Sequence, residues 1–105
     1  MKSYKISTKK DKKDNSVQLI LEGLLNVSNI GKIKAEFDLA LKNQRKINIL
    51  LENVDDADVA IVQLLKSFQQ QCNKDQIEFS VSLNLNSDIQ KLFLRADFMN
   101  LFEKN

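Results

Sequence analysis

The chain has 105 residues, a mass of 12.1 kDa and a formal net charge of +2, which suits one small domain spanning residues 1–105. It contains no histidine, no tryptophan and a single cysteine, Cys72. Imidazole acid–base chemistry, histidine metal ligation, an internal disulfide and a thiolate zinc site are therefore excluded. We assign no catalytic residue, cofactor or metal site, and expect a protein that is not an enzyme.

Two features of the sequence bear on its location in the cell. Residues 1–13 contain lysines but lack the apolar segment of a signal peptide. The longest apolar-rich stretch, Ile47 to Leu51, is far too short to span a bilayer, so no transmembrane segment is predicted. We therefore expect a cytoplasmic protein, with a peripheral position at the cytosolic face of a membrane as the alternative.

Charge is distributed unevenly along the chain. Residues 1–13 carry six lysines against one aspartate, whereas the remaining 92 residues carry ten basic and thirteen acidic side chains. Such a basic N-terminal hairpin can bind nucleic acid or an anionic membrane, or its lysines can simply discourage association through the sheet edge. Nucleic acid is the less favoured partner, because only Tyr4 accompanies the lysines as a stacking side chain.

The first half of the chain predicts a hairpin followed by a helix. Alternating apolar and polar residues at 4–8 and 17–22, joined by a polar turn, are typical of two antiparallel strands. Apolar residues at three- and four-residue steps then predict a helix over residues 29–43. Asn26 or Ser28 is the expected cap of its first turn.

The second half predicts two further strands and two further helices. A short apolar run at 46–53 and a strictly alternating run at 77–86 are the expected strands. Between them a helix is expected over 57–73, and after them the capping box of Ser87 and Gln90 predicts a short third helix. The expected buried stripe of the longer helix is Ile61, Leu64, Leu65, Phe68 and Cys72. A terminal turn or short helix is expected around Phe98, Leu101 and Phe102.

The order β-β-α-β-α-β-α, with a short C-terminal helix, predicts a two-layer α/β domain. Strand–helix–strand units favour parallel pairing, and the opening hairpin adds an antiparallel strand, so the four-stranded sheet is mixed. Three of the four strands alternate in polarity, which indicates helices mainly on one face of the sheet. The other face is then expected to be exposed to solvent and to carry Gln18, Glu22, Asn48, Glu52, Glu78, Ser80 and Ser82.

This order, together with the residues around 47–65, resembles the STAS domain family (sulfate transporter and anti-sigma factor antagonist) over nearly the whole chain. Family members commonly carry an apolar strand, Asp-Leu-Ser-x-Val, a three-residue loop, and Asp-Ser-Ser-Gly-Leu at the start of a helix. Here the strand ends in Leu50-Leu51-Glu52-Asn53-Val54, the loop is Asp55-Asp56-Ala57, and the helix opens with Asp58-Val59-Ala60-Ile61-Val62. The tail IQKLFLRADFMNLF also looks like the closing helix of the family.

The resemblance implies a STAS-like protein-interaction module for signalling, similar to an anti-sigma factor antagonist. In switched members a partner kinase phosphorylates a serine at the helix start; Val59 occupies that position here, so the classical phosphoswitch is expected to be absent. The implied partner is an anti-sigma factor or serine-kinase-like ATPase. The alternative is the ATPase and permease of a lipid-transporting ABC transporter, with this chain as the accessory subunit. The expected partner-binding residues are Asp55, Asp56, Asp58, Val59, Ala60, Ile61 and Val62.

Simpler explanations exist for the same residues. Asp56 or Asp58 can cap the helix, which requires no partner. A divalent metal held by the three nearby aspartates is disfavoured, because the glycine and the twelfth-position glutamate of a calcium loop are missing. Cys72 lies on the apolar stripe and is expected to be a buried, inert thiol. Ser67, two turns farther along the helix, is a poor substitute for the missing phosphate acceptor.

Overall fold

The structure of the chain is a computed structural model, which describes residues 3–40 and 42–95. The order of elements that the sequence predicts is confirmed, with shifts of a few residues at the ends of helices and strands. The predicted turn at 98–102 lies outside the described residues. The elements are β1 (Tyr4–Asp11), β2 (Ser16–Leu25), α1 (Ile30–Ala40), β3 (Lys46–Ala57), α2 (Val59–Lys74), β4 (Glu78–Asn84) and α3 (Ser87–Arg95).

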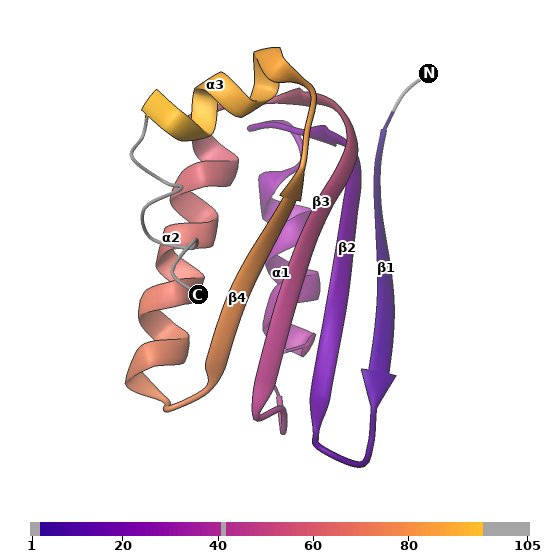
Figure 1. The fold of residues 1–105 in the computed structure, drawn as a ribbon, viewed down its shortest axis with the longest axis vertical. Coiled ribbons are helices and arrows are strands. Elements are labelled where there is room, and N and C mark those ends of the chain that lie inside the picture. Colours follow the sequence, from indigo (N-terminus) through magenta and orange to yellow (C-terminus); the bar gives the residue numbers. More distant parts are fainter. Residues whose placement is uncertain (1–2, 41, 96–105) are drawn as a thin grey trace.

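The four strands form one mixed sheet in the order β1-β2-β3-β4 (Figure 1). β1 and β2 are antiparallel, with a register that runs from Tyr4 opposite Gly23 to Asp11 opposite Ser16. The tight turn between them uses Asn15 at a φ of 55°, a left-handed conformation that asparagine tolerates. β2, β3 and β4 are mutually parallel, because α1 and α2 each return the chain to the end of the sheet where it started.

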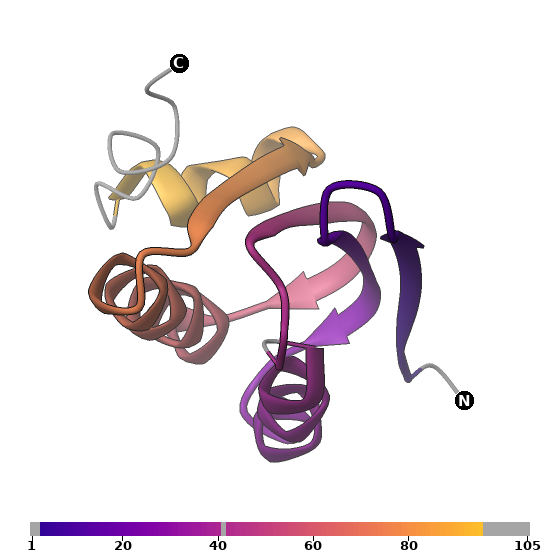
Figure 2. The same cartoon turned by 90° about the horizontal axis from the view of Figure 1, so that it is seen from below.

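Both long helices lie on the same face of the sheet. Seen from below, α1 and α2 run side by side on one side of the strands, and β1 forms the far edge (Figure 2). α3 crosses the end of the molecule where β4 finishes (Figure 1). The predicted two-layer α/β architecture with a four-stranded mixed sheet is confirmed.

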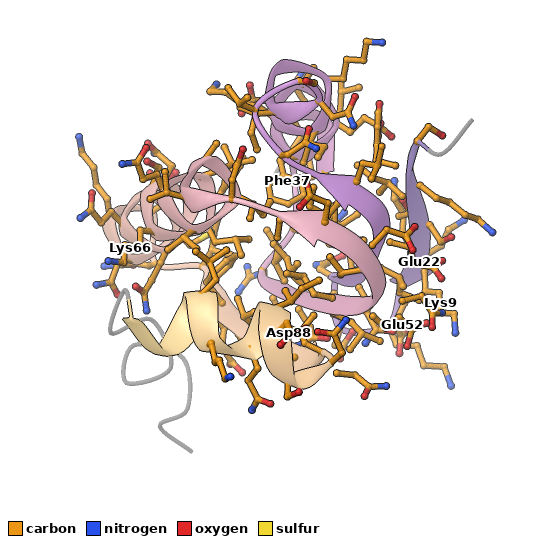
Figure 3. The ribbon with its side chains drawn as sticks, turned by 90° about the horizontal axis from the view of Figure 1, so that it is seen from above. Lys9, Glu22, Phe37, Glu52, Lys66 and Asp88 are labelled. Atoms are coloured by element: carbon orange, nitrogen blue, oxygen red, sulfur yellow. The ribbon has the colours of Figure 1, made fainter. Side chains whose placement is uncertain are left out.

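The core lies between this helical layer and the sheet. The Phe37 and Phe68 rings, from α1 and α2, meet edge to face with centroids 4.5 Å apart. In Figure 3, Phe37 lies between α1 and the strands, whereas Lys66 lies on the outer side of α2. The predicted stripe of α2 is confirmed, because all five of its side chains are buried. Burying each such side chain contributes about 1.5–3 kcal/mol, so the position of α2 on the sheet is firmly fixed.

The opposite face of the sheet is polar, as expected. All seven of the predicted polar residues on it are at least partly exposed. The register aligns Gln18, Asn48 and Ser80 across β2, β3 and β4. The amide of Gln18 donates to Oδ1 of Asn48 at 2.8 Å, and the Asn48 amide donates to Oγ of Ser80 at 2.8 Å. Ile20 departs from the pattern, because it is buried on this face and outside the main core.

The prediction of a loop at residues 55–57 is wrong, because these residues belong to β3. β3 continues its pairing with β2 past a register shift, so that Leu24 lies opposite Asp56 and Leu25 opposite Ala57. Asn53 has a φ of 50° at this irregularity, which is typical of a bulge. The extra residues carry the strand up to the start of α2.

Two predicted helix caps are also wrong. α1 begins after Asn29, whose backbone carbonyl accepts from the N–H of Ile33, so neither Asn26 nor Ser28 occupies the capping position. At α3 the cap is Asn86 rather than Ser87, because Oδ1 of Asn86 accepts from the N–H of Ile89 at 2.9 Å. In both cases the helix starts one or more residues away from the position suggested by the sequence motif.

Candidate functional site

Asp58 fixes the geometry of the start of α2. It adopts an extended backbone conformation and is the N-cap, with Oδ1 accepting from the N–H of Ala60 at 3.0 Å. Its other oxygen, Oδ2, accepts from the N–H of Val27 at 2.9 Å. One carboxylate thus joins the first turn of α2 to the connection between β2 and α1. The capping explanation of this aspartate is confirmed.

A second aspartate ties the same two segments together. Oδ2 of Asp56 accepts from the amide of Asn26 at 2.9 Å. Oδ1 of Asn26 in turn accepts from the N–H of Ser28 at 3.1 Å. The connection between β2 and α1 is therefore held against the end of β3 by side-chain bonds as well as by chain continuity. Asp55, the third aspartate of the cluster, is exposed beside them.

Exposed apolar side chains flank Asp58 on both sides. Val59, the first residue of α2, is 55% exposed, and Val27, which donates its N–H to Asp58, is 71% exposed. Sequence reasoning missed Val27, although a β-branched residue inside the polar segment Asn26–Asn29 was an available signal. Two valines presented to solvent next to carboxylates form the mixed apolar and acidic surface typical of a protein contact.

Three of the seven expected partner-binding residues are not part of this surface. Ile61 is 0% exposed and Val62 is 1% exposed, because both side chains point from α2 into the core. Ala60 is partly buried. We therefore define the α2-start surface as Val27, Asp55, Asp56 and Val59, with Asp58 as the residue that holds it in shape.

The three aspartates at the start of α2 are not arranged as a metal site. Among the residues that the structure describes, no three His, Cys, Asp or Glu side chains are placed to hold a metal ion. Both oxygens of Asp58 already accept backbone N–H groups, which leaves that carboxylate committed to structure. The expectation that Cys72 is buried is confirmed: it is 0% exposed, and burial, followed by the negative charge of Asp75, raises its pKa from 9.0 to about 11.

The helices of the described part of the chain, residues 3–40 and 42–95, include none that is long and apolar enough to cross a membrane.

The chain is thus a small mixed α/β domain with an exposed, side-chain-braced helix start at one end of its sheet. The family model of the STAS domain matches residues 7–104, and the chain belongs to the STAS domain family. The resemblance noted from residues 47–65 is confirmed by this match. No curated protein matches the chain.

Solved structures of anti-sigma factor antagonists have the same fold. One from Mycobacterium paratuberculosis matches with a TM-score of 0.80 and 12% identity, covering 95% of this chain and 83% of that one. The anti-sigma factor antagonist SpoIIAA in its unphosphorylated form matches with a TM-score of 0.74 and 16% identity, covering 95% and 85%. The Bacillus cell fate determinant SpoIIAA in its phosphorylated form matches with a TM-score of 0.67 and 16% identity, covering 95% and 88%.

Proposed function

We propose that this STAS domain is a non-enzymatic interaction module that binds a regulatory protein in the cytoplasm through the α2-start surface. The observation that carries the proposal is the pair of exposed valines, Val27 and Val59, on either side of Asp58. Apolar side chains of this size are costly to leave in water, and a partner that covers them recovers that free energy. The two hydrogen bonds of Asp58 fix the backbone on both sides, so little conformational entropy is lost on binding.

We further propose that binding is not switched by phosphorylation at the start of α2. Val59 has no hydroxyl group to accept a phosphate, and it is the first residue of the helix. A phosphate here would add nearly two negative charges beside the carboxylates of Asp56 and Asp58. Without a phosphate acceptor at position 59, the charge of the α2-start surface is not changed by phosphorylation there. A constant charge suits constitutive binding or regulation through the partner.

Two kinds of partner are compatible with this surface. The structural similarity to anti-sigma factor antagonists favours an anti-sigma factor or a serine-kinase-like ATPase. The alternative is the ATPase and permease of an ABC transporter, for which the chain would be an accessory subunit. In either case the acidic rim of Asp55 and Asp56 favours a partner with an apolar patch and nearby lysines or arginines.

The proposal is tested by crosslinked affinity purification of the tagged protein from its native cells. Val27→Asp and Val59→Asp each place a charge on the α2-start surface, and Val59→Asp also suits the N-terminus of a helix, so the fold is preserved. Leu39→Asp is the matched control. Leu39 is 67% exposed and lies near the C-terminal end of α1, whereas Val27 precedes the N-terminal end of the same helix.

The expected result is one protein complex that is recovered with the wild type and with Leu39→Asp and is lost with both valine variants. A soluble kinase-like ATPase in that complex supports the signalling role, whereas a permease with its ATPase supports the transporter role. Partners that survive both valine substitutions contradict the proposed surface. Circular dichroism of each variant establishes that the loss is not due to unfolding.

A further inference from the structure

A second charged surface lies at the end of the molecule opposite to the start of α2. The turn between β1 and β2, the connection from α1 to β3 and the connection from α2 to β4 all meet there (Figure 1). They meet because β2, β3 and β4 are parallel and therefore begin at the same end of the sheet. We call residues 9–14, 42–46 and 74–78 together the basic end.

The basic end combines cations that are far apart in the sequence. It carries eight basic side chains against the four carboxylates of Asp11, Asp14, Asp75 and Glu78. Half of the cations come from outside the N-terminal hairpin, so the fold adds four cations to the four hairpin lysines at this end. The eight are Lys9, Lys10, Lys12, Lys13, Lys42, Arg45, Lys46 and Lys74.

Backbone hydrogen bonds hold the three segments in a fixed arrangement. The N–H groups of Arg45 and Lys46 both donate to the carbonyl of Asn15, at 2.8 and 3.3 Å. The N–H of Glu78 donates to the carbonyl of Arg45 at 2.9 Å. The hairpin turn, the start of β3 and the start of β4 are thereby connected in one row, so their side chains form a common platform rather than three independent loops.

A hollow of about 250 Å³ opens at this platform, on the polar face of the sheet. Lys9, Lys10 and Lys46 line it together with the amide side chains of Gln18 and Asn48. Asp11 also lines it, and Lys46 lies 3.7 Å from Glu78 in an exposed ion pair of little strength. The lysine ammonium groups are the donors that this hollow offers to a phosphate-bearing headgroup, because the amides of Gln18 and Asn48 already donate to Asn48 and to Ser80.

We propose that the basic end binds an anionic lipid surface, with the α2-start surface held away from the membrane. Lipid is favoured over nucleic acid because the three segments contain no aromatic side chain for base stacking, and seven of the eight cations are lysines. The carboxylates at the other end, among them Glu52, Asp56 and Asp88, are repelled by anionic headgroups and so orient the domain. This inference goes beyond the proposed function and does not depend on it.

Sedimentation with lipid vesicles tests the proposal. The protein is mixed with vesicles of phosphatidylcholine alone or with added phosphatidylserine, at low and at high salt. The test variant carries four changes on exposed residues of the basic end: Lys12→Gln, Lys13→Gln, Lys42→Gln and Arg45→Gln. The control variant removes the same charge elsewhere: Lys5→Gln, Lys32→Gln, Lys34→Gln and Lys91→Gln.

The wild type and the control variant are expected to bind the phosphatidylserine vesicles at low salt and to dissociate from them at high salt. Neither is expected to bind the vesicles of phosphatidylcholine alone. The test variant is expected to bind on the order of 600-fold more weakly, since each of the four basic residues it loses contributes about fivefold near an anionic surface. Equal losses in the two variants, no binding by the wild type, or tighter binding to duplex DNA than to the vesicles would each overturn the proposal. Val59→Asp should bind vesicles as the wild type does, which separates this result from the partner test.

Discussion

Replacing Asp58 with alanine tests whether this carboxylate braces the α2-start surface. The substitution removes the acceptor for the N–H of Ala60, at 3.0 Å, and the acceptor for the N–H of Val27, at 2.9 Å. Loss of an N-cap costs about 1 kcal/mol, and loss of a hydrogen bond to a charged acceptor costs about 1.5 kcal/mol or more. We therefore expect Asp58→Ala to lower the free energy of unfolding by about 2–3 kcal/mol.

The assay is urea unfolding followed by far-ultraviolet circular dichroism. Circular dichroism is used because the chain has no tryptophan whose fluorescence could report unfolding. Two variants calibrate the result. Asp58→Asn keeps a cap oxygen and should lose only about 1 kcal/mol. Asp56→Ala removes a single exposed bond to Asn26 and should lose about 0.5–1 kcal/mol. If Asp58→Ala costs no more than Asp56→Ala, the double role of Asp58 is refuted.

The remaining predictions concern the two glycines and the cysteine. Gly23 has a φ of +88°, and a Cβ there would overlap the carbonyl oxygen of Ser3, so Gly23→Ala should lower the free energy of unfolding by about 2–4 kcal/mol. Gly31 in α1 has open space around it, so Gly31→Ala should raise the same quantity by about 0.5–1 kcal/mol; both are read from urea unfolding. Because Cys72 is buried, its reaction with a thiol reagent at pH 8 should be limited by the rate at which the protein unfolds locally or globally. Because its pKa is raised to about 11, the unfolded thiol ionises first, and stability should fall by about 2 kcal/mol as the pH rises from 9 to 11.

Specific results would contradict the predictions for the glycines and for Cys72. Similar unfolding curves for the two glycine variants would mean that the left-handed position at Gly23 has been placed wrongly. Rapid labelling of Cys72 in the native protein would contradict its burial against the sheet. A Cys72→Ala variant that loses stability between pH 9 and 11 as much as the wild type would assign that loss to other groups.

Periodicity predicts the elements of this fold well, because each element has one buried face. The strict alternation at 77–86 indicates both β4 and its polar side, and the stripe of α2 predicts which of its residues pack on the sheet. The continuation of β3 through residues 55–57 could not be predicted in the same way. It depends on a register shift against β2, which is a property of the pairing and not of either strand.

The candidate site was only partly accessible from the sequence. The resemblance to STAS domains marked residues 55–62, but it could not tell which of them face solvent, and Ile61 and Val62 belong to the core. Val27 joins the site only because a bond from its N–H to Asp58 crosses from one connection to another. The basic end has the same origin, since its three segments become neighbours only when parallel strands begin together.

Photocrosslinking in the native cells tests the central claim most directly. A photoreactive amino acid is placed at position 59 on the α2-start surface or at position 39 on α1, and the crosslinked proteins are identified by mass spectrometry. The account predicts a specific protein partner crosslinked from position 59 and not from position 39. The same partner crosslinked from position 39, with none from position 59, would contradict it.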